Sequence, residues 1–179
     1  WTLILLTLLS GPATARGQTP AVGPTFDCAK ASGQVEKLIC QDAGLAALDR
    51  RMADVFAAAI QAWPADVAAE QRAYQQGWIA GRNECWKDPD PRACTEQSYR
   101  TRIVELQIKS GQLVAPKAVA FGCTGAKDKP FLATFYNETD PPSAVFTYGN
   151  DQVIAFVAPS GSGARYTAAN VEFWEHQGE

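Results

Sequence analysis

The chain has 179 residues, 46% of them hydrophobic, and its 16 basic and 19 acidic side chains give a formal charge of −3. This length allows one or two small domains, each with a hydrophobic core. The charge is small and the sequence carries no basic stripe, which excludes nucleic acid as a partner.

The first nine residues form an apolar run, followed by the small-residue triplet Ala13, Thr14 and Ala15. This pattern is typical of a secretory signal that is cleaved after Ala15. The run is too short to span a bilayer, so we do not expect an integral membrane protein. The sequence lacks an initiating Met and a basic segment before the run, so residues 1–15 are interpreted as a signal peptide remnant. A buried strand or helix is the alternative, but residues 16–25 form a linker that contains Pro and Gly and separates the run from the rest of the chain.

Five cysteines in an exported chain of this size indicate disulfides. Cys28 and Cys40 are close in sequence, as are Cys85 and Cys94, so local pairing within each couple is the simplest arrangement. Zinc binding by these four thiolates is the alternative, but their spacing matches no zinc knuckle and an oxidising compartment disfavours free thiolates. Cys123 remains, either as a free thiol or with a partner beyond the end of the chain.

Residues 26–112 predict a small helical bundle. A short helix is expected around residues 34–40, and a longer one carries apolar residues at helical spacing from Leu45 to Trp63. Pro64 ends that helix, and a second Pro-containing segment at residues 88–91 separates two further helices. A core of this size is near the lower limit of independent stability, which makes two disulfide clamps physically sensible.

From residue 117 the pattern changes to short alternating runs that predict an antiparallel sheet or barrel. The runs are separated by turns rich in Gly, Asp, Asn and Pro, and they cover residues 119–123, 131–136, 144–148, 153–157 and 171–174. An open last strand would leave unpaired backbone groups at the sheet edge. We therefore expect the barrel domain, residues 117–179, to be incomplete at its C-terminus. The predicted fold class is α+β in two domains.

The segment from Ser160 to Tyr166 contains small hydrogen-bonding residues and an aromatic side chain, which predicts a rigid, protruding loop. A second Gly-containing turn, Glu175 to Gly178, comes after it at a distance that suits a hairpin neighbour. An ordinary Gly/Ser hairpin with a core tyrosine is the alternative interpretation. A serine hydrolase using Ser162 and His176 is disfavoured, because the segment has no G-x-S-x-G elbow and no helix comes after it.

The helical part resembles the LprI-type N-terminal domain, a secreted helical module named after a lysozyme inhibitor. The resemblance is carried by the cysteines and the apolar and charged residues around them: Phe26-Asp27-Cys28-Ala29-Lys30-Ala31, Glu36-Lys37-Leu38-Ile39-Cys40, Leu45-Ala46-Ala47-Leu48-Asp49, Gln71, Trp78, Arg82, Cys85, Cys94, Tyr99, Arg102-Ile103 and Leu106.

The strand-rich part resembles the MliC/PliC family of bacterial inhibitors of c-type lysozyme. The matching pieces are Phe121-Gly122-Cys123, Ala133-Thr134-Phe135-Tyr136, Ser162-Gly163-Ala164-Arg165-Tyr166 and Phe173-Trp174. The resemblance implies an eight-stranded barrel, a disulfide from the first strand to the C-terminal tail, and two loops that enter the lysozyme cleft. It also implies that Ser162 is one contact and that a lysine before the second glycine is the other. This sequence has no lysine there, so either His176 or Gln177 takes that position.

The resemblance predicts a periplasmic or secreted bacterial inhibitor of c-type lysozyme that is not an enzyme and needs no cofactor or metal. The expected lysozyme-binding residues are Ser162, Gly163, Tyr166, His176 and Gln177, with Tyr166 mainly packing behind the loop. Residues 113–179 hold seven acidic and four basic side chains, which favours encounter with a basic partner. A cell-envelope binding module, in which the helical part recognises peptidoglycan or an envelope protein, is the alternative. Homo-oligomer formation is left open.

Overall fold

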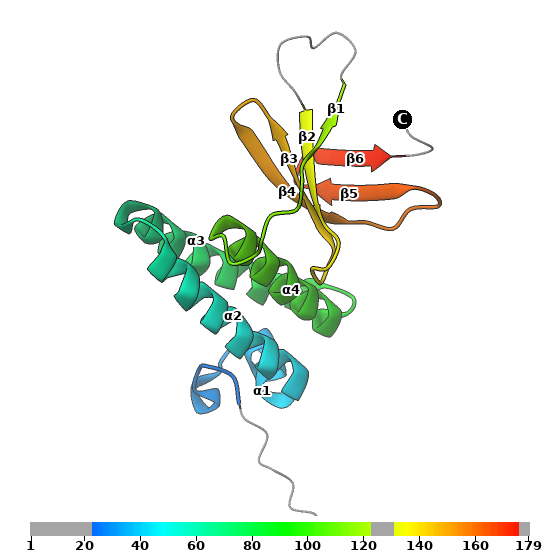
Figure 1. The fold of residues 1–179 in the computed structure, drawn as a ribbon. Coiled ribbons are helices and arrows are strands. Elements are labelled where there is room, and N and C mark those ends of the chain that lie inside the picture. The colour runs from blue at the N-terminus through cyan, green and yellow to red at the C-terminus, as the bar shows by residue number, and fades with distance from the viewer. Residues whose placement is uncertain (1–22, 123–130, 176–179) are drawn as a thin grey trace, which may run out of the picture.

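The computed structural model describes residues 23–122 and 131–175. Within them, helices form the N-terminal part and an antiparallel sheet forms the C-terminal part, as Figure 1 shows. The predicted α+β fold class is therefore confirmed. The signal peptide remnant, Cys123 and its expected disulfide, and the second loop with His176 and Gln177 lie outside the described residues.

The helices occur in the predicted order. The elements are η1 (Cys28–Lys30), α1 (Gln34–Gln41), α2 (Ala43–Ala62), α3 (Ala65–Asn83), η2 (Glu84–Lys87) and α4 (Pro91–Lys109). Asp42 caps α2 by accepting a hydrogen bond from the Leu45 amide at 2.9 Å. Asp90 caps α4 in the same way, and Pro91 occupies the first helical turn, where a missing N–H costs nothing.

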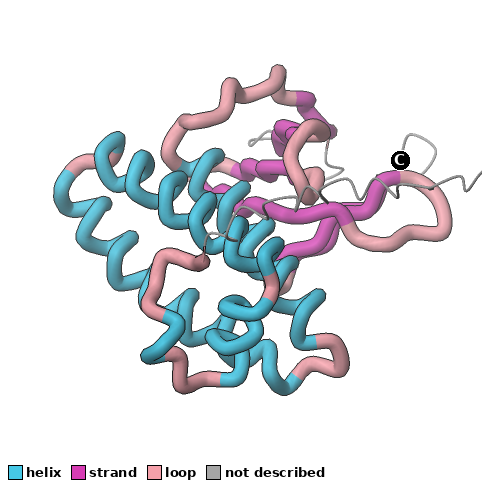
Figure 2. The backbone as a smooth tube through the Cα atoms, turned by 90° about the horizontal axis from the view of Figure 1, so that it is seen from below, coloured by secondary structure: helices cyan, strands magenta, loops and turns pink. Residues whose placement is uncertain are grey.

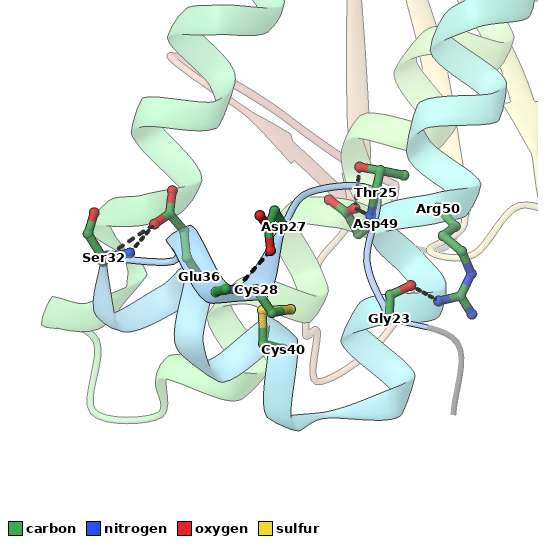
Figure 3. Close-up of a disulfide and its surroundings, with 11 residues drawn as sticks. Gly23, Thr25, Asp27, Cys28, Ser32, Glu36, Cys40, Asp49 and Arg50 are labelled. Carbon is green, nitrogen blue, oxygen red and sulfur yellow. Dashed lines mark hydrogen bonds between the residues drawn. A yellow bond between two sulfur atoms is a disulfide. The ribbon is translucent and has the colours of Figure 1, made fainter. Parts of the chain in front are cut away.

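The core of the helical part lies between α1, α2 and α4. Its buried residues are Val35, Ile39, Leu45, Met52, Cys85, Tyr99 and Ile103. Both predicted disulfides are present: Cys28 is bonded to Cys40, and Cys85 to Cys94. The first joins η1 to α1, as Figure 3 shows, and the second joins η2 to α4.

A buried polar network crosses this core. Tyr99 donates a hydrogen bond to Asp49 at 2.7 Å and accepts one from Arg82, whose guanidinium lies 3.7 Å from the same carboxylate. Asp49 also accepts hydrogen bonds from the amide and the hydroxyl of Thr25, as Figure 3 shows. Burial is the main reason that the pKa of Tyr99 is raised well above its usual range. The network therefore ties α2, α3, α4 and the incoming N-terminal segment together.

The described strands form one antiparallel meander in the order β1-β2-β3-β4-β5-β6. They are β1 (Val119–Phe121), β2 (Phe131–Tyr136), β3 (Ser143–Tyr148), β4 (Asp151–Val157), β5 (Ala164–Ala168) and β6 (Val171–Glu175). Strand β5 is not among the predicted runs, because its first residues belong to the segment expected as a protruding loop. Its pairing with β6 from Ala164 to Ala168 makes it a strand.

The sheet curls so strongly that its two edge strands meet through their side chains. Phe121 on β1 and Phe173 on β6 have ring centroids 5.4 Å apart, although these strands are not neighbours in the sheet. Phe146 on the central strand β3 lies 4.7 Å from the same Phe173 ring. The described strands therefore form a curled half-barrel around aromatic side chains, rather than the closed eight-stranded barrel that the resemblance implies.

Helix α4 connects the two parts. Tyr99 and Ile103 on α4 are buried in the helical core. Arg100, on the same helix, forms an ion pair with Asp140 in the turn between β2 and β3. A cavity of about 490 Å³ lies between the end of α4, at Glu105 to Lys109, and β3 and β4. Figure 2 shows the strands gathered on one side of the helices.

In the described part of the chain, no helix combines the length and the apolar character that a bilayer crossing requires.

Candidate functional site

The candidate site is built on residues 158–163, which join β4 to β5 and which we name the seryl loop. Pairing between β4 and β5 ends at Val157 and Tyr166, and the Ala158 amide closes the base by donating to the Arg165 carbonyl at 2.8 Å. In Figure 1 the loop projects away from the helices, on the same side as the end of β6. It therefore forms the end of this hairpin, and residues 159–163 are exposed.

The tip of the seryl loop is held by its own residues. The hydroxyl of Ser160 donates to the carbonyl of Ser162 and accepts a hydrogen bond from the Ser162 amide at 3.3 Å. Gly163 has a φ of 70°, a left-handed conformation that glycine adopts without the Cβ clash of other residues. Ser162 and Gly163 are both exposed, so these two of the predicted contact residues lie at the surface.

Trp174 braces the tip from the neighbouring hairpin. Its indole nitrogen donates to the Ser162 carbonyl at 3.0 Å, across 12 residues of sequence. Trp174 is opposite Arg165 in the register of β5 and β6 and is 54% exposed. The predicted site does not include this residue, because its role depends on the β5–β6 register and β5 is not predicted. An aromatic donor facing a Ser/Gly turn across an expected hairpin is the signal that would have indicated it.

Tyr166 lies behind the loop. It is only 6% exposed, and its ring centroid is 5.5 Å from that of Phe135 and 6.2 Å from that of Phe146. Burial raises the pKa of its hydroxyl. The tyrosine therefore anchors β5 in the aromatic core, which is the packing role that the sequence suggested for it.

Arg165 and Glu172 form an ion pair at 2.9 Å between β5 and β6. The hydrogen bond to Arg165 lowers the pKa of Glu172, and the same bond raises the pKa of Arg165. Arg165 also donates to the Pro159 carbonyl at 3.3 Å, so its side chain supports the base of the seryl loop.

The second predicted contact segment begins where the described residues end. Glu175, the last residue of β6, is opposite Ala164, which comes directly after the seryl loop. His176 and Gln177 come after Glu175 in the sequence and lie outside the described residues, so their part in the site stays a prediction. The hairpin register brings the start of this segment beside the first loop.

The chemistry of the seryl loop is that of hydrogen bonding. Across residues 23–122 and 131–175, no group of three or more His, Cys, Asp or Glu side chains is placed to hold a metal ion. At the tip, a serine hydroxyl and an indole N–H donate to a backbone carbonyl. These internal bonds order the tip, and an ordered, exposed tip suits recognition of a partner by shape.

Comparison with known proteins identifies both parts of the chain. Residues 121–179 match the family described as membrane-bound lysozyme-inhibitor of c-type lysozyme (MliC). Lipoprotein LprI of Mycobacterium bovis and of Mycobacterium tuberculosis is 38% identical over 178 residues, covering 99% of this chain and 88% of the relative. Both descriptions refer to proteins of the cell envelope, which agrees with the predicted localisation. No solved structure matches the chain. The chain therefore belongs to the LprI lipoprotein family and carries an MliC-type lysozyme-inhibitor domain at residues 121–179.

Proposed function

We propose that this chain is an envelope protein that inhibits c-type lysozyme by inserting the seryl loop into the active-site cleft of the enzyme. The family relationship supports an inhibitor, since the matching family is named for that activity. The observation that supports the seryl loop as the inserted element is its geometry. It is an exposed tip, held by hydrogen bonds from two side chains, at the end of a hairpin directed away from the helices.

The chemistry of the target explains why such a loop suffices. Lysozyme cleaves a glycosidic bond with two carboxyl groups, one protonated and one ionised. A serine hydroxyl can donate to a carboxylate and accept from a carboxylic acid, so Ser162 can satisfy either group. The loop then occupies the place of substrate without any reaction of its own. The proposal is therefore a competitive, non-enzymatic inhibitor that needs no cofactor.

The second contact in this proposal comes from the residues after Glu175. His176 or Gln177 supplies a hydrogen-bond donor where the MliC/PliC resemblance implies a lysine. A charged histidine would form the stronger bond with a carboxylate, because ionised partners strengthen hydrogen bonds. The register of Glu175 opposite Ala164 supports this placement, since both segments then start from the same end of the hairpin.

The test is the substitution Ser162→Ala, measured as the inhibition constant against a c-type lysozyme on a cell-wall substrate. Leaving a buried partner group unsatisfied costs about 1–3 kcal/mol. Inhibition should therefore weaken by about 5- to 150-fold. Ser32→Ala is the matched control, because Ser32 is also exposed but lies in the helical part. An inhibition constant that is the same for Ser162→Ala and wild type would remove Ser162 from the mechanism.

A second candidate function is envelope binding by the helical part. Trp86 is 47% exposed and borders a groove of about 200 Å³ that Leu38 and Pro91 also line. An exposed indole beside such a groove is suited to stacking on a sugar ring. Retention of the wild-type chain on purified cell-wall material, lost on Trp86→Ala with lysozyme inhibition intact, would support this function as a separate one.

A further inference from the structure

We propose that Trp174 is a positioning residue for the inhibitory loop: together with Ser160, it fixes the Ser162 carbonyl and so presets the conformation of the tip. This inference rests on the proposed function of the seryl loop, since it assigns a role within that site. Trp174 lies on a strand outside the loop. Its contact with the loop is already present in the free protein, and the affinity for lysozyme then depends on that contact.

Two hydrogen bonds converge on one oxygen atom. The Ser160 hydroxyl reaches the Ser162 carbonyl from within the loop, and the Trp174 indole reaches it from β6 at 3.0 Å. A carbonyl oxygen has two lone pairs, so it can accept both bonds together. The local bond alone leaves the loop free to swing as a unit about its base. The bond from β6 ties the tip to a strand of the sheet and removes that freedom.

Fixing this carbonyl fixes the peptide plane between Ser162 and Gly163. Gly163, at a φ of 70°, then directs the chain into β5. The direction of the Ser162 side chain is set by the backbone on both sides of it. An exposed loop that is disordered before binding must lose this freedom in the complex, and that loss subtracts from affinity. The bond from Trp174 therefore lowers the entropy that binding must remove.

The exposure of Trp174 agrees with this role. The side chain lies on the outer face of β6, opposite Arg165, and remains 54% exposed. The aromatic core of the curled sheet is formed by other residues, including Phe146, Tyr166 and Phe173. Trp174 therefore adds little to the core, and its polar end is directed at the seryl loop.

The test is Trp174→Phe, which removes the indole N–H and keeps an aromatic ring. Loss of a hydrogen bond of average strength should raise the inhibition constant about fivefold. Hydrogen exchange at the Ser162 and Gly163 amides of the free protein should become faster, while the thermal midpoint stays close to that of wild type. The matched control is Trp63→Phe, which removes an indole N–H that donates to the Lys109 carbonyl in the helical part, and it should alter neither the inhibition constant nor the exchange of these two amides.

Three outcomes would overturn the inference, and they are distinguishable. Equal inhibition by Trp174→Phe and wild type would reject the positioning role and leave the proposed function intact. A weaker inhibition with unchanged loop exchange would make Trp174 a direct contact of the enzyme instead. A wild-type chain that does not inhibit lysozyme would overturn the proposed function, and the role of Trp174 in inhibition with it. Ser160→Ala should also speed exchange at these two amides, because it removes the acceptor of the Ser162 amide and the other bond to the Ser162 carbonyl.

Discussion

The helical and the strand-rich parts of this chain achieve order by different means. The helices are joined by two disulfides in the described residues and by a buried network of Asp49, Arg82 and Tyr99. The described strands rely on aromatic packing around Phe146 and Phe173, and on hydrogen bonds to the exposed tip. Because the two parts are ordered differently, we expect that one substitution can lower the stability of the helical part and another can weaken the proposed lysozyme inhibition by the strand-rich part, each without the other effect.

The largest expected effect is in the helical network. Asp49→Ala leaves the buried Arg82 without its carboxylate partner, and breaking a buried ion pair typically costs about 3–5 kcal/mol. We expect a lower denaturant midpoint for the helical signal in circular dichroism. Asp54→Ala is the control, because Asp54 lies exposed on the same helix.

Separate roles for the two parts require that folded Asp49→Ala protein still inhibits lysozyme. Its inhibition constant, measured well below the unfolding midpoint, should equal that of wild type. A large loss of inhibition by fully folded protein would show that the helical part takes part in recognition, and the separation of roles would be wrong.

An intermediate effect is expected at the two glycines of the tip. Gly163→Ala places a Cβ at a φ of 70°, which costs about 1 kcal/mol, and should lower the stability of the strand-rich part. A Cβ at Gly161 meets nothing within 4 Å, so Gly161→Ala should leave stability unchanged. If the tip enters a narrow cleft, Gly161→Ala should nevertheless weaken inhibition, because the added methyl group faces the partner. Full inhibition by Gly161→Ala would argue against close approach at this residue.

The smallest effect concerns the Arg165–Glu172 pair. The pKa of Glu172 is lowered from its ordinary value of 4.5 in the folded protein, chiefly by the hydrogen bond from Arg165. A lowered folded pKa means that the pair stabilises the protein above pH 4.5 and that this contribution is lost as the pH falls through the folded pKa. The stability difference between wild type and Glu172→Gln should therefore be small near neutral pH and vanish in acid. A difference that persists unchanged in acid would show that the carboxylate charge is not its cause.

The sequence predicted most of the helical part correctly because its signals are local. Apolar spacing, Pro64 and the Pro-containing turn set the helices, and short separations paired the cysteines. The local signals do not show how far each helix is covered. Tyr74 on α3 is 53% exposed, because helical spacing gives a face but does not say how far a partner helix covers it.

The site was predicted less completely because its decisive contacts cross strands. A local motif indicated Ser162 and Tyr166 as candidates, but the bond from Trp174 depends on the register of β5 and β6. Strand β5 was missed because its first residues belong to the loop motif, and because Ala164 and Ala168 at its ends lack the branched or aromatic side chains that favour strands. When one strand is not predicted, its cross-strand contacts are not predicted either, so a candidate loop is easier to locate in a sequence than the residues that support it.

The double use of α4 has a consequence for how this protein can evolve. One face of the helix carries Tyr99 and Ile103 into the helical core, while Arg100 reaches Asp140 between two strands. Exchange of the inhibitor sheet onto an unrelated carrier would have to preserve that contact or replace it. The match to the inhibitor family begins at residue 121, after α4, so a new carrier for the sheet would need to supply only this side-chain contact, while sequence drift at Arg100 is constrained by both parts of this chain.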